Sequence, residues 1–264
     1  MKILVCTMVI NDWYYDIVKY AVKNLTSYCE KHNYDLIIDD GKCLNTVYDG
    51  TRDIPWYKVL LIKKLMLEQD FDYLFWYDID SQINNHDIKL EYFINNYLSN
   101  NSDIELVATQ DRTTLNTGMM FIKKSDYIIS LMDRIWNNEN EFDKTFHEQT
   151  SFEQLYHNDI ELRKKIKIIP YGPLRDELVV VWAQFNPEKT FIIHFSRCSH
   201  DKLGFYYMID LYYRDKLDEE NDDEYKGRLD WINNRSIREI SLLCNGTYVP
   251  RIYSRRVKNI FNIE

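Results

Sequence analysis

The sequence predicts an α/β fold: a mostly parallel, mixed sheet with helices on both faces, followed by a helical C-terminal appendage. Strand-like and helix-like segments alternate through the first two thirds of the chain, and this alternation favours parallel strands joined by helices that cover the sheet. The chain has 264 residues, 45% hydrophobic and 28% charged, a composition typical of a globular protein with a substantial core. From Asp215 onward an acidic run and a basic tail replace the alternation. We therefore predict a main domain over residues 1–214 and a helical extension, packed on it, over residues 215–264.

The first three elements form a βαβ unit. An apolar strand over Ile3–Ile10 precedes a helix over Asp16–His32, whose apolar residues recur on one stripe, and a short strand follows over Asp35–Asp39. The later elements are predicted from the same periodicities and from Pro, Ser, Asp or Thr near helix starts. They are helices over Trp56–Gln69, Asp126–Trp136 and Glu148–Tyr156, and strands over Phe71–Tyr77, Glu105–Thr109, Met119–Ile122, Ile166–Ile169 and Phe191–Phe195.

Charge and hydropathy exclude several classes of protein. With 33 basic and 42 acidic side chains the net charge is -9, which repels a polyphosphate, so no nucleic-acid partner is expected. No apolar run approaches the 18 or more residues that a transmembrane helix needs, and the N-terminus has the pattern of a buried strand rather than a signal peptide. We therefore expect a cytoplasmic or otherwise soluble protein without a membrane anchor. Its five cysteines, an odd number without a CxxC pair, are expected to be reduced.

Several familiar catalytic motifs are missing from the sequence. It contains neither a dinucleotide-binding nor a P-loop glycine pattern, so a phosphorylated ligand would have to be held by metal and side chains. It also lacks the nucleophile elbow of α/β-hydrolases and the paired histidines of zinc proteases. His194, Cys198 and His200 imitate a zinc cluster, but their spacing matches none of the common zinc patterns, so this is the weaker alternative.

Two carboxylates mark the end of a hydrophobic strand. In the segment FDYLFWYDID, Asp78 and Asp80 are separated by one residue and are expected to point the same way, so that both can face one divalent cation. Ligands of open α/β sheets bind beyond the carboxyl ends of the strands, where this pair is expected. A solvated acidic turn is the structural alternative.

Five motifs in order resemble one family. They are Trp56-Tyr57-Lys58, LFWYDID, LNTGMMFIKKSD, His147-Glu148-Gln149-Thr150 and FIIHFSRC. Together they resemble the galactosyl- and xylosyltransferase family (glycosyltransferase family 34), which includes fungal α-galactosyl and α-mannosyl transferases and plant xyloglucan xylosyltransferases. The resemblance covers roughly residues 1 to 200. It implies a Rossmann-like GT-A fold and retaining transfer of a sugar from a nucleotide sugar, with a UDP-sugar as the leading donor.

The resemblance implies a metal site. Asp80 and His194 match the positions that hold Mn²⁺ in the family, with Mg²⁺ as the alternative ion, and Asp78 matches a residue that contacts the ribose or a metal-bound water. All three are therefore candidate metal ligands. A carboxylate and an imidazole suit Mn²⁺, whose charge neutralises a diphosphate. Taken alone, His194 has the pattern of a core histidine.

The resemblance also implies donor-binding and catalytic residues. Asn116-Thr117-Gly118 resembles a family turn in which Gly118 lets the backbone approach the donor sugar and Asn116 bonds its hydroxyls; a plain strand-entry turn is the alternative. Lys58 matches a position from which it can reach the diphosphate, although on a helix that also bears Lys63 and Lys64 it can equally be a surface charge.

Glu148 and Gln149 match an acidic-Gln pair of the family, whose Gln lies near the anomeric carbon. In that place Gln149 is a poor nucleophile, and the resemblance implies a same-face, retaining transfer in which the departing phosphate helps to deprotonate the acceptor. Glu148 is also explained as a favourable charge at a helix start. The family often has Gly before the cysteine of FIIHFSRC; here Arg197 stands there, and it or Lys202 is expected to contact the diphosphate unless the loop is reshaped.

Other expected contacts are less specific. Thr7 lies toward the end of the first strand, which opens onto the same crevice, and is a candidate for contact with the nucleobase or ribose. Tyr77 is a candidate to line the pocket. Tyrosines that can stack on an acceptor sugar or bury a homodimer contact are Tyr206, Tyr207, Tyr212 and Tyr213.

The leading hypothesis is thus a metal-dependent retaining glycosyltransferase that acts on a glycan or other hydroxyl acceptor. Two alternatives stay open. One is a metal-dependent nucleotidyltransferase or phosphohydrolase, which usually needs a further carboxylate near the metal. The other is a non-catalytic module that binds a sugar nucleotide or a glycan.

Overall fold

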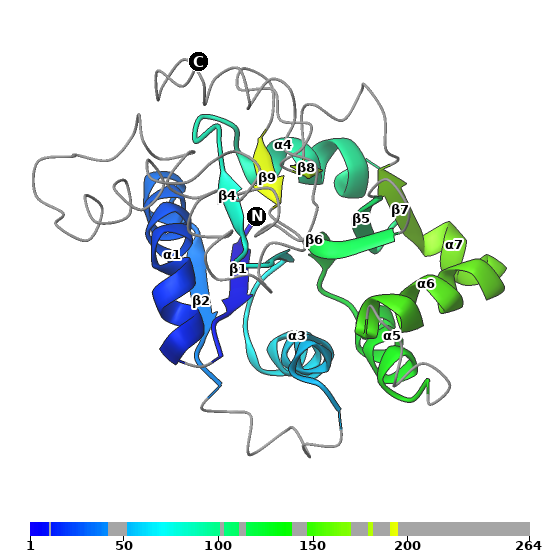
Figure 1. Cartoon of the computed structure of the whole chain (residues 1–264). Coiled ribbons are helices and arrows are strands. Elements are labelled where there is room, and N and C mark those ends of the chain that lie inside the picture. The colour runs from blue at the N-terminus through cyan, green and yellow to red at the C-terminus, as the bar shows by residue number, and fades with distance from the viewer. Residues whose placement is uncertain are drawn as a thin grey trace, which may run out of the picture.

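The main sheet of the protein has six strands, and a second sheet of three short strands lies beside it (Figure 1). The structure is a computed structural model that describes residues 1–10, 12–41, 52–100, 103–110, 115–138, 147–169, 179–181 and 191–194. In spatial order, the main sheet is β2 (Asp35–Asp39), β1 (Ile3–Met8), β3 (Tyr73–Tyr77), β6 (Leu115–Lys123), β5 (Leu106–Gln110) and β7 (Ile166–Ile169). The second sheet is β4 (Ser81–Ile83), β9 (Ile192–His194) and β8 (Val179–Val181).

The main sheet is mixed and mostly parallel, which confirms the predicted class. β1 runs parallel to β2 and β3, and β5 runs parallel to β7. Only β6 runs against its neighbours, β3 and β5. Because β6 is antiparallel, its first residues lie beside the carboxyl end of β3, from which Asp78 and Asp80 continue.

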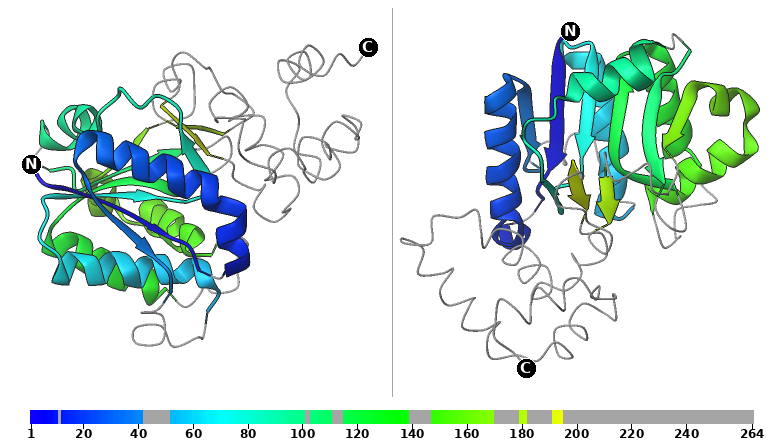
Figure 2. Two further views of the ribbon diagram at one scale, coloured as in Figure 1. Left: turned by 90° about the vertical axis from the view of Figure 1, so that its left-hand side faces the viewer. Right: turned by 90° about the horizontal axis from the view of Figure 1, so that it is seen from above.

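Helices cover both faces of the main sheet and divide the described core into two parts. On one face, α1 and α4 pack against Val5, Phe75 and Phe121. On the other face, α3, α5, α6 and α7 pack against Cys6, Trp76 and other strand residues, which alternate along each strand with those of the first face. The ribbon views show helices on both sides of the sheet (Figure 2). Burial on both faces explains why the strands are nearly continuously apolar. The helical segments are α1 (Asp12–His32), η1 (Ile54–Trp56), α3 (Tyr57–Glu68), α4 (Leu90–Ile94), η2 (Asn95–Ser99), α5 (Asp126–Trp136), α6 (Glu148–Asn158) and α7 (Ile160–Lys165).

Most predicted elements are present, with shifted ends. The first helix begins at Asp12 rather than Asp16, and the strand predicted from Met119 begins four residues earlier, at Leu115. β4, α4 and α7 were not expected, because segments of three to six residues are too short to show a period. Phe195 and the predicted helical extension over residues 215–264 lie outside the described residues.

The small sheet brings distant parts of the chain together. β4 pairs antiparallel with β9, so that Ser81 lies opposite His194 and Ile83 lies opposite Ile192. The residue before β4 is Asp80, so this pairing places Asp80 near a histidine more than a hundred residues away in sequence. Among the described residues, no helix combines the length and the apolar character that a membrane crossing requires.

Candidate active site

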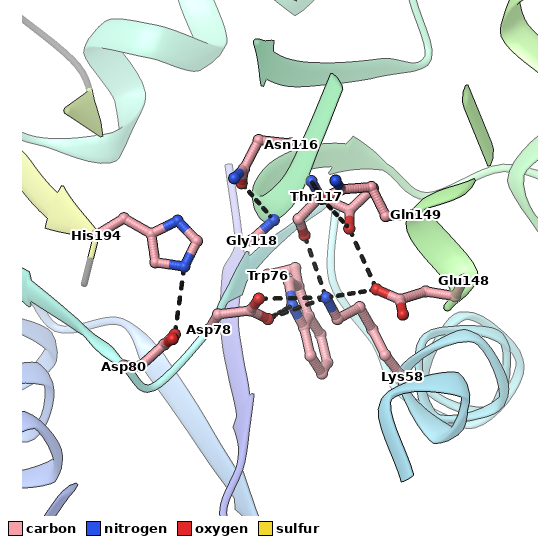
Figure 3. Close-up of polar contacts among 10 residues, drawn as sticks. All are labelled: Lys58, Trp76, Asp78, Asp80, Asn116, Thr117, Gly118, Glu148, Gln149 and His194. Carbon is pink, nitrogen blue, oxygen red and sulfur yellow. Dashed lines mark hydrogen bonds and ion pairs between the residues drawn. The ribbon is translucent and has the colours of Figure 1, made fainter. Parts of the chain in front are cut away.

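Three of the predicted metal ligands lie together at the carboxyl end of β3 (Figure 3). Asp78 directly follows β3, Asp80 directly precedes β4, and His194 ends β9. One ligand atom from each residue lies within 4.8 Å of the other two, and Asp80 Oδ1 is 3.3 Å from His194 Nε2. Asp80 and His194 are largely buried, with side-chain exposures of 13% and 5%. This arrangement excludes the solvated acidic turn that was the alternative for the carboxylate pair.

The Asn116-Thr117-Gly118 segment lies inside β6 and is not the turn that the sequence predicted. The pairing of β6 with β5 is irregular here, because Ala108 lies opposite Met120 while the next residue, Thr109, lies opposite Asn116. Such a bulge leaves backbone groups without ladder partners, and local bonds replace them. Asn116 Oδ1 accepts a hydrogen bond from the Gly118 amide at 2.8 Å, and the Gly118 carbonyl accepts one from the Asp78 amide at 2.8 Å.

Gly118 is required at its position because no side chain fits there. A Cβ atom would lie 2.5 Å from His194 Cε1, 2.9 Å from Asn116 Oδ1 and 3.1 Å from Asp78 Oδ2. We expect Gly118→Ala to displace the imidazole and to cost about 1–3 kcal/mol of folding stability, as overpacking does. Urea denaturation measures the stability, and electron paramagnetic resonance of free Mn²⁺ measures binding to the predicted metal site, which the displaced imidazole should weaken. A folded variant with unchanged Mn²⁺ affinity would contradict this account of Gly118.

Lys58 is buried between two carboxylates, so it is not the surface charge that its helix allowed. Its side chain is 5% exposed. Its ammonium group lies 3.0 Å from Asp78 Oδ1 and 2.9 Å from Glu148 Oε1, and it donates to the Thr117 carbonyl at 3.4 Å. Lysine has three donor hydrogens, which these three groups can take up. In this structure Lys58 is therefore the counter-ion of the site, and contact with a diphosphate stays a prediction.

Glu148 and Gln149 begin α6 and both bond to Thr117 of β6. Glu148 is in the first helical turn, as its charge favours, and its Oε1 accepts from Thr117 Oγ1 at 3.2 Å. Gln149 Oε1 accepts from the Thr117 amide at 3.2 Å. The pair thus connects α6 to the bulge of β6. The catalytic roles predicted for Asn116, Glu148 and Gln149 stay predictions.

The charges of the site perturb one another because they are buried together. Burial raises the pKa of Asp78 above its usual range, although nearby Lys58 opposes the shift. Burial also acts to raise the pKa of Asp80, but His194 and Lys58 together lower it. Burial acts to lower the pKa of His194, whereas Asp80 and Asp78 together raise it. Burial likewise opposes the charge of Lys58, but Asp78 and Glu148 raise its pKa above the ordinary value. The pKa of each of these groups is therefore set by its charged neighbours as well as by burial.

Sequence reasoning did not assign a role to Trp76 or Thr117. The indole Nε1 of Trp76 donates to Asp78 Oδ1 at 2.7 Å and orients that carboxylate. Trp76 stands two residues before Asp78, and this spacing places the two side chains on one face of a strand. The spacing alone could have indicated that Trp76 lies beside Asp78. Thr117 lies in the middle of the Asn116-Thr117-Gly118 segment, and its contacts with Lys58, Glu148 and Gln149 depend on tertiary structure, which the sequence does not show.

Thr7 and Tyr77 are fully buried. Tyr77 belongs to the core part beneath α1 and α4, on the face of the sheet opposite to Lys58. The Thr7 hydroxyl has no hydrogen-bond partner among the described residues. Contact of either residue with a nucleotide stays a prediction. The other predicted residues lie outside the described part of the chain: Arg197, Cys198, His200, Lys202, Tyr206, Tyr207, Tyr212 and Tyr213.

Comparison with known sequences gives a family match over most of the chain. The sequence model of the galactosyl transferase GMA12/MNN10 family matches residues 2–100 and 90–203. A curated relative, the "Probable alpha-1,6-mannosyltransferase MNN10" of Saccharomyces cerevisiae, is 23% identical over 188 residues, which are 61% of this chain and 48% of the yeast protein. The chain thus spans about half the length of this relative.

Two solved structures share the fold. A glycosyltransferase involved in the glycosylation of the major capsid of PBCV-1 has a TM-score of 0.60 at 14% identity, over 79% of this chain and 100% of that one. The galactosyltransferase LgtC, solved with donor and acceptor sugar analogs, has a TM-score of 0.50 at 13% identity, over 85% of this chain and 99% of that one. At these identities the likeness concerns the fold alone, which is of the GT-A type, as expected.

Proposed function

Because this chain belongs to the galactosyl transferase GMA12/MNN10 family, we propose that it is a metal-dependent glycosyltransferase that uses a nucleotide sugar. The proposed donor is a UDP-linked hexose or pentose, and the acceptor is a glycan or another hydroxyl compound. The proposed outcome is transfer with retention of anomeric configuration.

One observation carries this proposal: Asp78 and Asp80, which are one residue apart, and His194, more than a hundred residues later, come together with ligand atoms within 4.8 Å of one another. The set fits a divalent ion, because carboxylate oxygens and an imidazole nitrogen suit Mn²⁺. A bound Mn²⁺ would neutralise the diphosphate of the donor and stabilise it as a leaving group. Asp80 and His194 would hold the ion, since Asp78 is already bonded to Lys58 and Trp76.

The residues at the start of α6 bear on the route of the proposed retaining transfer. Glu148 Oε1 is bonded to Lys58 and to Thr117 Oγ1, and Gln149 carries an amide. A carboxylate in an ion pair and an amide are both weak nucleophiles, so neither residue is suited to form a covalent sugar intermediate. If the transfer retains configuration, as proposed from the family, it would therefore proceed on one face of the sugar without a covalent sugar intermediate, with Gln149 orienting the sugar. Arg197 and Lys202 are proposed to contact the diphosphate.

The first test is ligand-dependent thermal stability. The wild-type protein is heated with UDP, GDP or CMP, each with Mn²⁺ or with EDTA. A ligand at about 100 times its dissociation constant should add about 2.7 kcal/mol of stability. We expect UDP with Mn²⁺ to raise the melting temperature and UDP with EDTA to have little effect. No shift with any nucleotide in a folded protein would overturn the proposal.

The second test separates an enzyme from a binding module. Release of nucleotide is measured from UDP-sugars, with and without a panel of sugar acceptors. Acceptor-stimulated release is the expected result for a transferase. Binding of the donor without transfer or hydrolysis would instead identify a non-catalytic sugar-nucleotide module.

A further inference from the structure

A polar stripe on α1 faces the segment that follows β4. Asn24, Tyr28 and His32 are spaced at i, i+4 and i+8, which puts them on one side of a helix. The Tyr28 hydroxyl donates to the Ile88 carbonyl at 2.7 Å, and His32 Nε2 donates to the His86 carbonyl at 2.7 Å. Side chains of one helix therefore bind the backbone of one connecting segment at several points.

Asn24 is the end of this stripe nearest to the candidate metal site. Its Oδ1 accepts from the Ile83 amide at 2.9 Å, and its Nδ2 donates to the Ile83 carbonyl at 3.1 Å. One side-chain amide thus binds both backbone polar groups of one residue, as a neighbouring strand would. The Ile83 amide fixes the orientation of Asn24, so Nδ2 is also the donor toward His86 Nε2, 2.9 Å away. His86 Nε2 must therefore be an acceptor.

Ile83 is the last residue of β4, and β4 contributes to the relative position of two metal ligands. Ile83 lies opposite Ile192, and Ser81 lies opposite His194. Asp80 immediately precedes Ser81. Both strands have only three residues, and so short a pair has few ladder bonds with which to fix its own position. The bonds from Asn24 anchor β4 to a helix of 21 residues.

We propose that Asn24 is a positioning residue for the metal site: by binding Ile83 it fixes β4 against β9 and sets the separation of Asp80 and His194. Asn24 touches neither ligand and acts through the strand. The role rests on the proposed function, because it presumes that Asp80 and His194 hold a divalent ion. Groups that hydrogen-bond directly to metal ligands typically contribute 10- to 100-fold to metal affinity, so an effect transmitted through a strand is expected at the low end of this range.

The test compares Mn²⁺ affinity in Asn24→Ala and in a matched control. Mn²⁺ alone is titrated into each protein, and free Mn²⁺ is followed by electron paramagnetic resonance. We expect Asn24→Ala to bind Mn²⁺ about tenfold more weakly. The control, Ile135→Val, removes one buried methyl group on the opposite face of the sheet and should lower the melting temperature without changing Mn²⁺ affinity more than about twofold. Ser27→Ala, an exposed change on α1 itself, should change neither property.

A second variant and a second readout separate positioning from folding. Asn24→Asp keeps the acceptor for the Ile83 amide and loses the donor to its carbonyl, so its Mn²⁺ affinity should lie between those of wild type and Asn24→Ala. Hydrogen exchange at the Ile83 amide should accelerate in Asn24→Ala, because that amide loses its acceptor. If wild type binds Mn²⁺ and a folded Asn24→Ala binds it equally well, the positioning role is wrong while the proposed function stands. If wild type binds no Mn²⁺, the metal-dependent function fails and the positioning role fails with it.

Discussion

Lys58→Met should destabilise the protein by about 3–5 kcal/mol. The substitution removes the ammonium group that lies within 3.0 Å of both Asp78 and Glu148, and it leaves two carboxylates in a largely buried place. Removing one partner of a buried ion pair costs this much because the remaining charge is removed from water and no longer has an opposite charge beside it. Urea denaturation in EDTA measures the loss, since EDTA prevents a metal ion from replacing the lysine charge.

The same helix supplies a matched control for this prediction. Lys63, also on α3, pairs with Asp133 at 2.5 Å, but the two side chains are 31% and 47% exposed. Exposed pairs contribute little, so Lys63→Met should cost no more than about 1 kcal/mol. Adding Glu148→Gln to Lys58→Met removes one uncompensated carboxylate and should restore part of the stability. Equal losses for the two lysine variants would show that Lys58 is not the counter-ion of a buried cluster.

The sequence predicted the main sheet well because its strands are long enough to show their apolar pattern. The position of Asp78 and Asp80 followed from one strong signal, an aromatic strand that ends in carboxylates. The start of β6 was a different case. Asn116 and Gly118 are turn-forming residues, and they suggested a turn where the chain continues as a bulged strand. Their local preference is overridden because Asn116 and Asp78 supply the bonds that the irregular ladder lacks.

The candidate site was only partly predictable, because most of its contacts join residues that are far apart in the sequence. The order of the motifs indicated His194 as a candidate ligand. Its position beside Asp80 depends on the pairing of two three-residue strands, which are too short to show a hydrophobic period in the sequence. Lys58 was ambiguous because a helix position shows whether a side chain can be buried, but not which carboxylates lie beside it. Asn24 gave no signal, since its partner is the backbone of Ile83, which is 59 residues away. Contacts between distant backbone and side-chain groups become visible only in three dimensions.

Asp80→Asn should abolish Mn²⁺-dependent binding of nucleotide and lower the rate of sugar transfer about a thousandfold. The amide is close in size to the carboxylate, so the fold should persist, but the charge that a divalent ion needs is lost. A bound metal contributes several kcal/mol to leaving-group stabilisation, and about 4 kcal/mol corresponds to this factor in rate. Mn²⁺ titration, the thermal shift with UDP and the initial transfer rate measure the three effects.

Asp133→Asn is the control for the Asp80 variant. It makes the same chemical change in an ion-paired carboxylate on α5, far in sequence from Asp80 and His194, and it should leave Mn²⁺ binding and transfer unchanged. In the wild-type protein, Asp80 Oδ1 lies 3.3 Å from His194 Nε2. In Asp80→Asn, the side-chain amide can form a hydrogen bond to the same imidazole. Retention of that contact preserves folding without preserving the ion. An Asp80→Asn protein that still binds UDP only when Mn²⁺ is present would place the metal on other residues and would remove the main support for the proposed function.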